Sequence, residues 1–222
     1  MRKNFTDNTG HRWEYDDVLE GLEVYFLGGD NLSDSVTVPS EINGKTVVSI
    51  AQNAFYNSKF MKSVVIPDTI KYINPYAFEE CTNLEEVKFG SSVESIGWGA
   101  FMNCKNLTEV NLPESVKYLR SEAFSGCKKM TSINIDKEVV SIEQEVFAGC
   151  YSLANINVSP DNKRYSSING NLYDKDQRVL IQYAIGKEDE SFTLPETVVK
   201  VGKNAFGGCS HLKQVITYYK FW

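Results

Sequence analysis

The sequence predicts a solenoid of stacked coils, mostly short β-strands joined by irregular or 3-10 loops. Six phenylalanines define the repeat, and the first five are spaced by 23 residues each. Alanine precedes five of them, and cysteine follows five of them by three residues. Apolar residues recur six and nine positions after each one. A period of this length is typical of a solenoid, because one unit cannot bury its apolar face without a neighbour. The six residues are Phe55, Phe78, Phe101, Phe124, Phe147 and Phe206.

The aligned columns indicate inward-facing ladders of one continuous core. Equivalent side chains in adjacent coils should lie about 4.8 Å apart, the spacing between neighbouring strands. We expect Phe101→Ala to destabilise the protein more than Phe55→Ala, because Phe55 lies nearer the end of the predicted stack.

Residues 1–35 do not fit the repeat and predict an N-terminal β-hairpin cap. Two short strands, Trp13–Tyr15 and Leu22–Leu27, flank an acidic turn, and the turn residues 28–31 follow them. Such a cap covers the first layer of a solenoid core. Five acidic residues are expected on its solvent face rather than in a calcium site, because no Asp-x-Asp-x-Asp-Gly loop accompanies them. They are Glu14, Asp16, Asp17, Glu20 and Glu23.

The predicted solenoid covers residues 36–217. The gap between Phe147 and Phe206 is 59 residues, 36 more than the regular period. Residues 159–191 within it predict a variant coil with a three-stranded meander, in which Asn169-Gly170 is a two-residue hairpin turn. Residues 218–222 form a C-terminal tail with four aromatic residues. Either these aromatics fold over the last coil or the natural chain continues beyond it.

Composition narrows the classes of partner. The formal net charge of −6 disfavours a nucleic-acid partner, which would favour a basic stripe. No apolar run approaches the roughly 18 residues of a membrane span, so this chain is expected not to span a membrane. No signal peptide is visible, although a cleaved one would leave the same sequence.

The five cysteines share one repeat column and are expected to be buried, unpaired fillers of the core. Parallel side chains one coil apart hold Cβ atoms slightly too far apart for a disulfide. Neither a Cys-x-x-Cys pair nor a nearby histidine suggests a metal site. The two histidines, His11 and His211, lie near opposite ends of the predicted stack, and no nucleophile or phosphate-loop motif occurs. We therefore predict no enzyme and no catalytic, metal or cofactor-binding residue.

Two segments carry a family resemblance: IPDTIKYINPYAFEECTNLEEVKF (66–89) and LPESVKYLRSEAFSGCKKMTSINI (112–135). They resemble the leucine-rich repeats of BspA-like bacterial surface proteins. The resemblance implies a curved leucine-rich-repeat solenoid, here with about six 23-residue coils, one variant coil and the N-terminal β cap. It also implies a secreted or surface-attached protein, and some members are similar to adhesins. The family motif is structural and carries over no functional residue. Ser58 and Val146 depart from its Cys and Ala columns.

Outward residues of the repeated strand are the first candidate site. They form two polar columns that would line an exposed sheet and contact a protein of a host or of another bacterium. The alternative is a sheet tuned for solubility, with stacked asparagines bonding one another. The candidate residues are Glu86, Lys88, Glu109, Asn111, Ser132, Asn134, Asn155 and Asn157.

Tyr56, Tyr76 and Trp98 are the second candidate site, an aromatic patch in successive repeats. Such a patch suits a protein interface or a glycan. Partial burial on the loop side of the coils is the simpler interpretation. Three functions follow: an extracellular recognition module, a structural spacer presenting another domain, and a carbohydrate-binding module.

Overall fold

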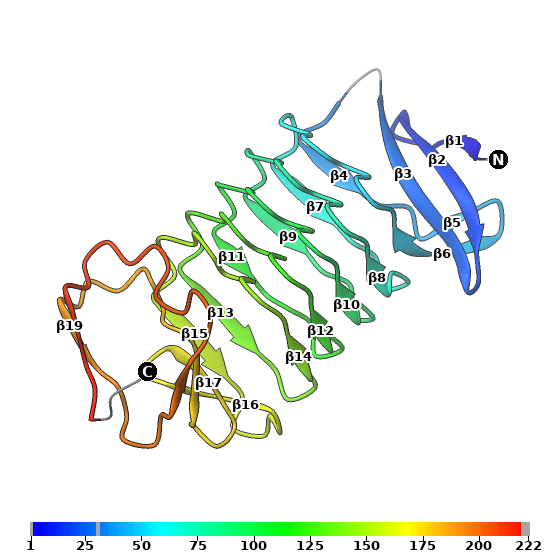
Figure 1. Ribbon diagram of the computed structural model, residues 1–222. Helices are drawn as coiled ribbons and strands as arrows, with labels where there is room; N and C mark the ends of the chain where they lie inside the picture. Colours follow the sequence, from blue (N-terminus) through cyan, green and yellow to red (C-terminus); the bar gives the residue numbers. More distant parts are fainter. Residues whose placement is uncertain (1, 30–31, 219–222) are drawn as a thin grey trace.

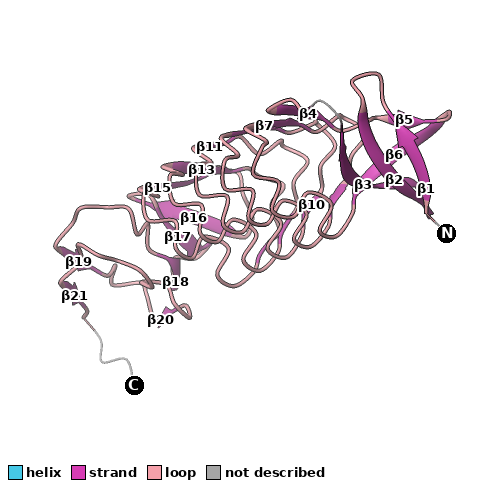
Figure 2. Ribbon diagram, turned by 90° about the horizontal axis from the view of Figure 1, so that it is seen from above, coloured by secondary structure: helices cyan, strands magenta, loops and turns pink. Residues whose placement is uncertain are grey.

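The computed structural model describes residues 2–29 and 32–218 as an elongated β-solenoid with a strand cap at its N-terminal end (Figure 1). Each regular coil contributes one short strand to each of two sheets, in which the strands of successive coils run parallel. The second view shows the coils joined by loops, with the cap at one end and β19 and β21 near the other (Figure 2). Within the described ranges, no helix is long and apolar enough to cross a membrane.

Sheet A runs from the cap along the solenoid. Its strands are joined in the order β1-β2-β3-β6-β8-β10-β12-β14, and β5 pairs with β6 at its side. The strand bounds are β1 (Lys3–Thr6), β2 (His11–Val18), β3 (Gly21–Gly29), β5 (Glu41–Ile42), β6 (Lys45–Ile50), β8 (Tyr72–Ile73), β10 (Ser95–Ile96), β12 (Tyr118–Leu119) and β14 (Ser141–Ile142).

Sheet B gathers the other strand of each coil, and all of its pairings are parallel. Equivalent residues meet in register, so Val64 lies opposite Val87 and Ile133 opposite Ile156. Its strands are β4 (Ser35–Thr37), β7 (Ser63–Val65), β9 (Glu86–Lys88), β11 (Glu109–Val110), β13 (Ser132–Ile135) and β15 (Asn155–Val158).

The cap has three strands where the sequence predicts two, and they are longer than expected. Strand β2 pairs with β3 along its whole length, from His11↔Gly29 to Val18↔Gly21, while β1 covers the other edge of β2. The alternating burial of β2 is explained by this position, with one face on the core and one in solvent. Of the predicted turn 28–31, Gly28 and Gly29 belong to β3, and residues 30 and 31 lie outside the described residues.

Acidic residues of the cap form ion pairs on its surface. Lys3 and Lys45 both contact Asp17, and Lys71 contacts Glu20 from the neighbouring coil. These partners are solvent-exposed lysines, as expected for a solvated face, and each such pair contributes little stability.

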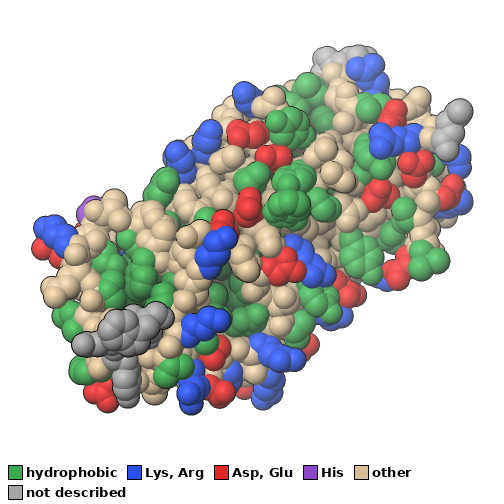
Figure 3. Space-filling view, viewed as in Figure 1, with side chains coloured by type: hydrophobic (Ala, Val, Ile, Leu, Met, Phe, Trp, Pro, Cys, Tyr) green, Lys and Arg blue, Asp and Glu red, His purple; other side chains and the backbone are tan. Residues whose placement is uncertain are grey.

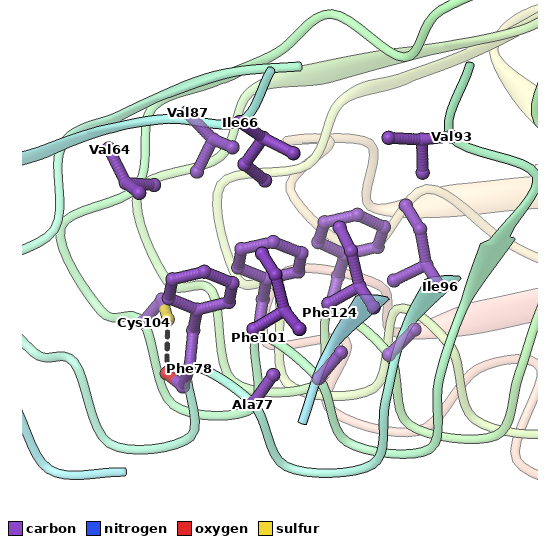
Figure 4. Close-up of a cluster of buried hydrophobic side chains, with 14 of the residues drawn as sticks. Val64, Ile66, Ala77, Phe78, Val87, Val93, Ile96, Phe101, Cys104 and Phe124 are labelled. Atoms are coloured by element: carbon purple, nitrogen blue, oxygen red, sulfur yellow. Dashed lines mark hydrogen bonds between the residues drawn. The ribbon is translucent and has the colours of Figure 1, made fainter. Parts of the chain in front are cut away.

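The phenylalanine ladder is confirmed in the regular coils. Ring centroids lie 4.8 Å apart for Phe55–Phe78, 4.9 Å for Phe78–Phe101 and 5.4 Å for Phe101–Phe124, with the rings nearly parallel (Figure 4). The separation widens to 6.4 Å for Phe124–Phe147. These rings are buried and form the centre of the main core.

Phe55 is not near an open end of the ladder. Phe26 of the cap stacks on it at 4.9 Å, and buried Trp13 meets its edge at 5.8 Å. The cap therefore supplies the ring that a preceding coil would supply. The expectation that Phe55→Ala is milder than Phe101→Ala loses its physical basis, because Phe55 has aromatic neighbours on both sides.

The expectation of one continuous core is wrong beyond Leu172, the last buried residue of the main core. A second cluster begins in the variant coil, where Phe206 packs against Tyr183 at 5.4 Å and Phe192 at 6.0 Å instead of against Phe147. The cause is the predicted meander, whose antiparallel strands enter between the last regular coil and the final one. These parts contain β16 (Tyr165–Ile168), β17 (Asn171–Asp174), β18 (Val179–Gln182), β19 (Ser191–Thr193), β20 (Lys200–Val201) and β21 (Gln214–Ile216).

Irregular turns, rather than 3-10 helix, surround each ladder phenylalanine within the described ranges. The residue two positions before it has a positive φ in every coil, as at Tyr76 (59°) and Glu122 (59°). The residue two positions after it does as well, as at Glu80 (58°) and Gly126 (74°). A residue in the left-handed backbone conformation at both places prevents the turn from continuing as a helix.

The cysteine column is buried and unpaired from Cys81 to Cys150, as predicted, and it also forms hydrogen bonds. Each thiol donates to the carbonyl oxygen of the phenylalanine one coil earlier, such as Cys104 Sγ to Phe78 O at 3.1 Å (Figure 4). The column therefore links adjacent turns in addition to filling space. Cys209, in the final coil, is only half-buried.

We expect only Cys209 to react with a thiol reagent in the native protein at mildly alkaline pH, because it alone of the five cysteines is partly accessible to solvent. Burial raises the pKa of Cys81 and Cys150 to about 12 and that of Cys209 to about 11. It raises the pKa of Cys104 and Cys127 well above the ordinary value. Because the thiolate is the nucleophile, the four core thiols should react only after unfolding. Prompt modification of two or more thiols, counted by mass spectrometry, would contradict the packing described here.

Candidate functional site

The predicted polar strip lies on the outer face of sheet B, and all eight of its side chains are exposed. One column is aligned by the strand register Glu86↔Glu109↔Ser132↔Asn155. The second includes the pair Asn134↔Asn157. The structure therefore places the candidate residues on one surface with the regular spacing of the coils.

Few interactions restrain these side chains. Asn157 Nδ2 donates to Asn134 Oδ1 at 3.1 Å, and Lys88 lies 3.8 Å from Glu86. The stacked-asparagine interpretation thus holds for one pair. A shallow hollow of about 250 Å³ lies over the strip and is lined by Glu109, Asn111 and Asn134, among others. The strip can offer amide and carboxylate groups to a partner without first breaking an internal network.

The aromatic residues divide into a pair and a separate ring. Tyr76 and Trp98 have ring centroids 5.4 Å apart, at an interplanar angle of 42°. Among the described residues, no ring contact joins Tyr56 to either of them. Tyr56 follows its ladder phenylalanine, whereas Tyr76 and Trp98 precede theirs, so they lie on opposite sides of the buried Phe. The structure does not bring the three residues into one patch.

Trp98 instead lines a groove on the outer face of sheet A, with a volume of about 670 Å³. Its floor and walls come from four successive coils and from the final coil. A second hollow of about 620 Å³ continues from it, at the place where β14 ends the sheet and the variant coil begins. The first groove is lined by Tyr72, Ile73, Asn74, Pro75, Ser95, Gly97, Trp98, Arg120, Ser121, Glu122, Glu143, Gln144, Glu145 and Lys203.

Two ion pairs hold four of the five charged side chains of this groove. Arg120 donates to Glu143 at 2.8 Å, and Ser121 donates to the same carboxylate through its backbone N–H at 2.9 Å. Partial burial opposes ionisation of Glu143, but these hydrogen bonds outweigh it and keep its pKa below the ordinary value. Lys203 lies 3.6 Å from Glu145. Glu143 is therefore a carboxylate with a fixed orientation at neutral pH.

Sequence reasoning missed the polar residues of this groove. They occupy two periodic columns, four and three residues before each ladder phenylalanine; Arg120 and Glu143 share one, and Trp98, Gln144 and Lys203 share the other. The columns could have been read from the period. They were not recognised because the residue type changes from coil to coil. A surface column, unlike a core column, is not restricted to one residue type. That Lys203 meets Glu145 depends on how the 36 additional residues fold.

Charges on the visible face are mixed in sign, with acidic and basic side chains interspersed and apolar ones in small groups (Figure 3). Over residues 2–29 and 32–218, no group of three or more His, Cys, Asp or Glu is arranged to hold a metal ion. A surface of mixed charge with small apolar groups is suited to binding another molecule by direct contact.

Fold and surfaces together define a non-globular β-solenoid of the leucine-rich-repeat class. The chain belongs to the family described as the BspA type leucine rich repeat region, whose model matches six copies over residues 48–176 and 186–221. No curated protein sequence matches the chain significantly.

Solved structures share the fold. A leucine-rich repeat protein from Eubacterium ventriosum superposes with a TM-score of 0.73 and 21% identity, over 97% of this chain and 60% of that one. The pneumococcal vaccine antigen PcpA gives 0.69 and 22%, over 97% and 64%. A leucine rich cell surface protein from Faecalibacterium prausnitzii gives 0.51 and 23%, over 96% and 76%. The chain thus spans less than two thirds of the first two structures.

Proposed function

We propose that this protein is a non-enzymatic recognition module of a bacterial surface or secreted protein, and that it binds a protein partner through the polar strip on sheet B. One observation carries the proposal: eight exposed polar side chains lie along one face of sheet B with almost no internal partners. The backbone of the sheet is already ordered by its strand pairing, so binding has only the side chains to immobilise.

Membership of the family supports an interaction role, and two of the related structures are described as a vaccine antigen and a cell surface protein. These descriptions support an extracellular location for this chain. The partner is proposed to be a protein of the host or of another bacterium. Its contact area would include Asn111 and Asn134 at the centre of the strip.

The double substitution Asn111→Arg and Asn134→Arg should weaken binding to any partner of the strip by at least about tenfold, which corresponds to about 1.4 kcal/mol. Two large cations would replace short amides at the centre of the contact. Partners would be captured from extracellular matrix and bacterial surface preparations, identified, and their affinity measured with purified protein by surface plasmon resonance.

Sheet A offers a position for a control variant. Tyr118 and Ser141 are surface positions of sheet A, so Ser141→Arg adds a similar cation away from the strip. Unchanged affinity for every identified partner in the strip variant, with native thermal stability, would refute the strip assignment. That result would favour the spacer interpretation.

A further inference from the structure

A trough runs along the outer face of sheet A, formed by three hollows that share lining residues. The first, of about 290 Å³, lies beside the turn between β2 and β3. Tyr72 and Asn74 line both this hollow and the groove of about 670 Å³. Glu143, Gln144 and Lys203 line both that groove and the hollow at the variant coil. The trough therefore crosses successive coils along the solenoid axis.

Trp98 is an exposed aromatic side chain in this trough, with 48% of its surface accessible. The ring of Tyr76 lies against it, and Tyr76 itself fits over Gly99. A Cβ atom at Gly99 would lie 2.8 Å from the Tyr76 ring, so the glycine makes room for the pair. An indole fixed in this way offers a flat apolar surface amid polar side chains.

Hydrogen-bonding groups without a partner line the same groove as the indole. Within the described part of the chain, the Gln144 amide, the Glu122 carboxylate and the Trp98 Nε1–H have no hydrogen-bond partner. The remaining ionic groups largely cancel, because Arg120 is paired with Glu143 and Lys203 with Glu145. The trough thus combines an aromatic surface, free planar polar groups and little net charge.

We propose that this trough binds a neutral saccharide chain. A sugar ring has an apolar C–H face that packs on an indole, and hydroxyl edges that pair with amide and carboxylate groups. Trp98 would stack on one ring, and Glu122 in the next coil would bond a hydroxyl of that ring. Gln144, two coils from Trp98, would bond a neighbouring unit of the saccharide. An anionic glycan would meet the unpaired carboxylate of Glu122.

An extended peptide is a poorer fit to the same surface. Peptides that bind sheets gain their main-chain hydrogen bonds by adding a strand at a free edge. The strands beneath the central groove have no such edge, because β8 pairs with β6 and β10, and β12 pairs with β10 and β14. The central groove therefore offers no free strand edge to a peptide, and this favours a ligand that side chains can bind through its hydroxyl groups.

The test uses the full chain and an array of linear neutral oligosaccharides of glucose, mannose, galactose or N-acetylglucosamine units, with sialylated and sulfated glycans beside them. Neutral hits would be quantified by titration calorimetry. Trp98→Ala should weaken binding roughly tenfold or more, as expected for an aromatic anchor. Tyr56→Ala is the matched control, because Tyr56 is 54% exposed but lies outside the trough. Binding by the Tyr56 variant should be unchanged.

Three results would overturn the proposal: no binding to any neutral saccharide, binding restricted to anionic glycans, or equal affinity of Trp98→Ala and the unaltered protein. The Asn111→Arg and Asn134→Arg variant should bind the saccharide normally, because its changes lie on sheet B. Failure of the saccharide test is thus distinguishable from failure of the proposed protein-binding strip.

Discussion

Phe101→Ala should lower the free energy of unfolding by about 3–5 kcal/mol. Phe101 is fully buried, and its ring contacts Phe78 at 4.9 Å, Phe124 at 5.4 Å and Phe89 at 5.8 Å. Coils on either side are held by ladders of backbone hydrogen bonds, including Phe101 N–H to Ala123 O at 2.8 Å. The neighbours therefore cannot close the cavity fully, and the cavity adds to the lost burial of the ring.

Chemical denaturation of purified variants would measure this effect. Phe55→Ala should cost a similar amount, because Phe26 and Phe78 stack on its two faces. Phe206→Ala should cost less, because Phe206 is only half-buried in the smaller cluster. A loss for Phe206→Ala as large as that for Phe101→Ala would contradict the division of the core.

Asn162→Ala should also be strongly destabilising, by about 3 kcal/mol or more, because it leaves several buried backbone groups without partners. Asn162 is 0% exposed. Its Nδ2 donates to Asp136 O at 2.7 Å and to Val139 O at 3.0 Å. Its Oδ1 accepts from the N–H groups of Arg164 and Tyr165, each at 2.8 Å. One side chain thus fixes the path by which the chain leaves the regular coils.

The control for this variant is Asn157→Ala, which removes an exposed asparagine with a single hydrogen bond to Asn134. Its effect on the free energy of unfolding should lie within about 0.5 kcal/mol. Hydrogen exchange would locate the loss in Asn162→Ala, with protection falling first in β16 to β18. Equal stability of the two variants would show that the buried network contributes nothing.

Periodicity predicts the regular part of this fold well. Each coil meets a nearly identical neighbour, so the residue type that suits one layer suits the next. The columns that contain Phe78 and Cys81 are therefore visible in the sequence. The cap was less well predicted, because nothing in the period indicates that Phe26 and Trp13 would complete the ladder. Cap residues contact the repeats through their own, non-repeating geometry.

The two candidate sites also differ in how far the sequence predicts them. The strip on sheet B follows from alternation along a strand, and its eight residues lie where the pattern places them. The trough on sheet A does not follow from any single repeat, since its lining joins Trp98, Gln144 and Lys203 across coils of different composition.

By itself the sequence determined the inward columns, the strand alternation and the position of the variant coil, because these depend on contacts that recur every 23 residues. Only the tertiary structure decided where the core divides and which side chains enclose the trough. Those features depend on contacts made once, such as Asn204 Nδ2 to Glu145 Oε1 at 2.8 Å across 59 residues. A contact made once leaves no period in the chain.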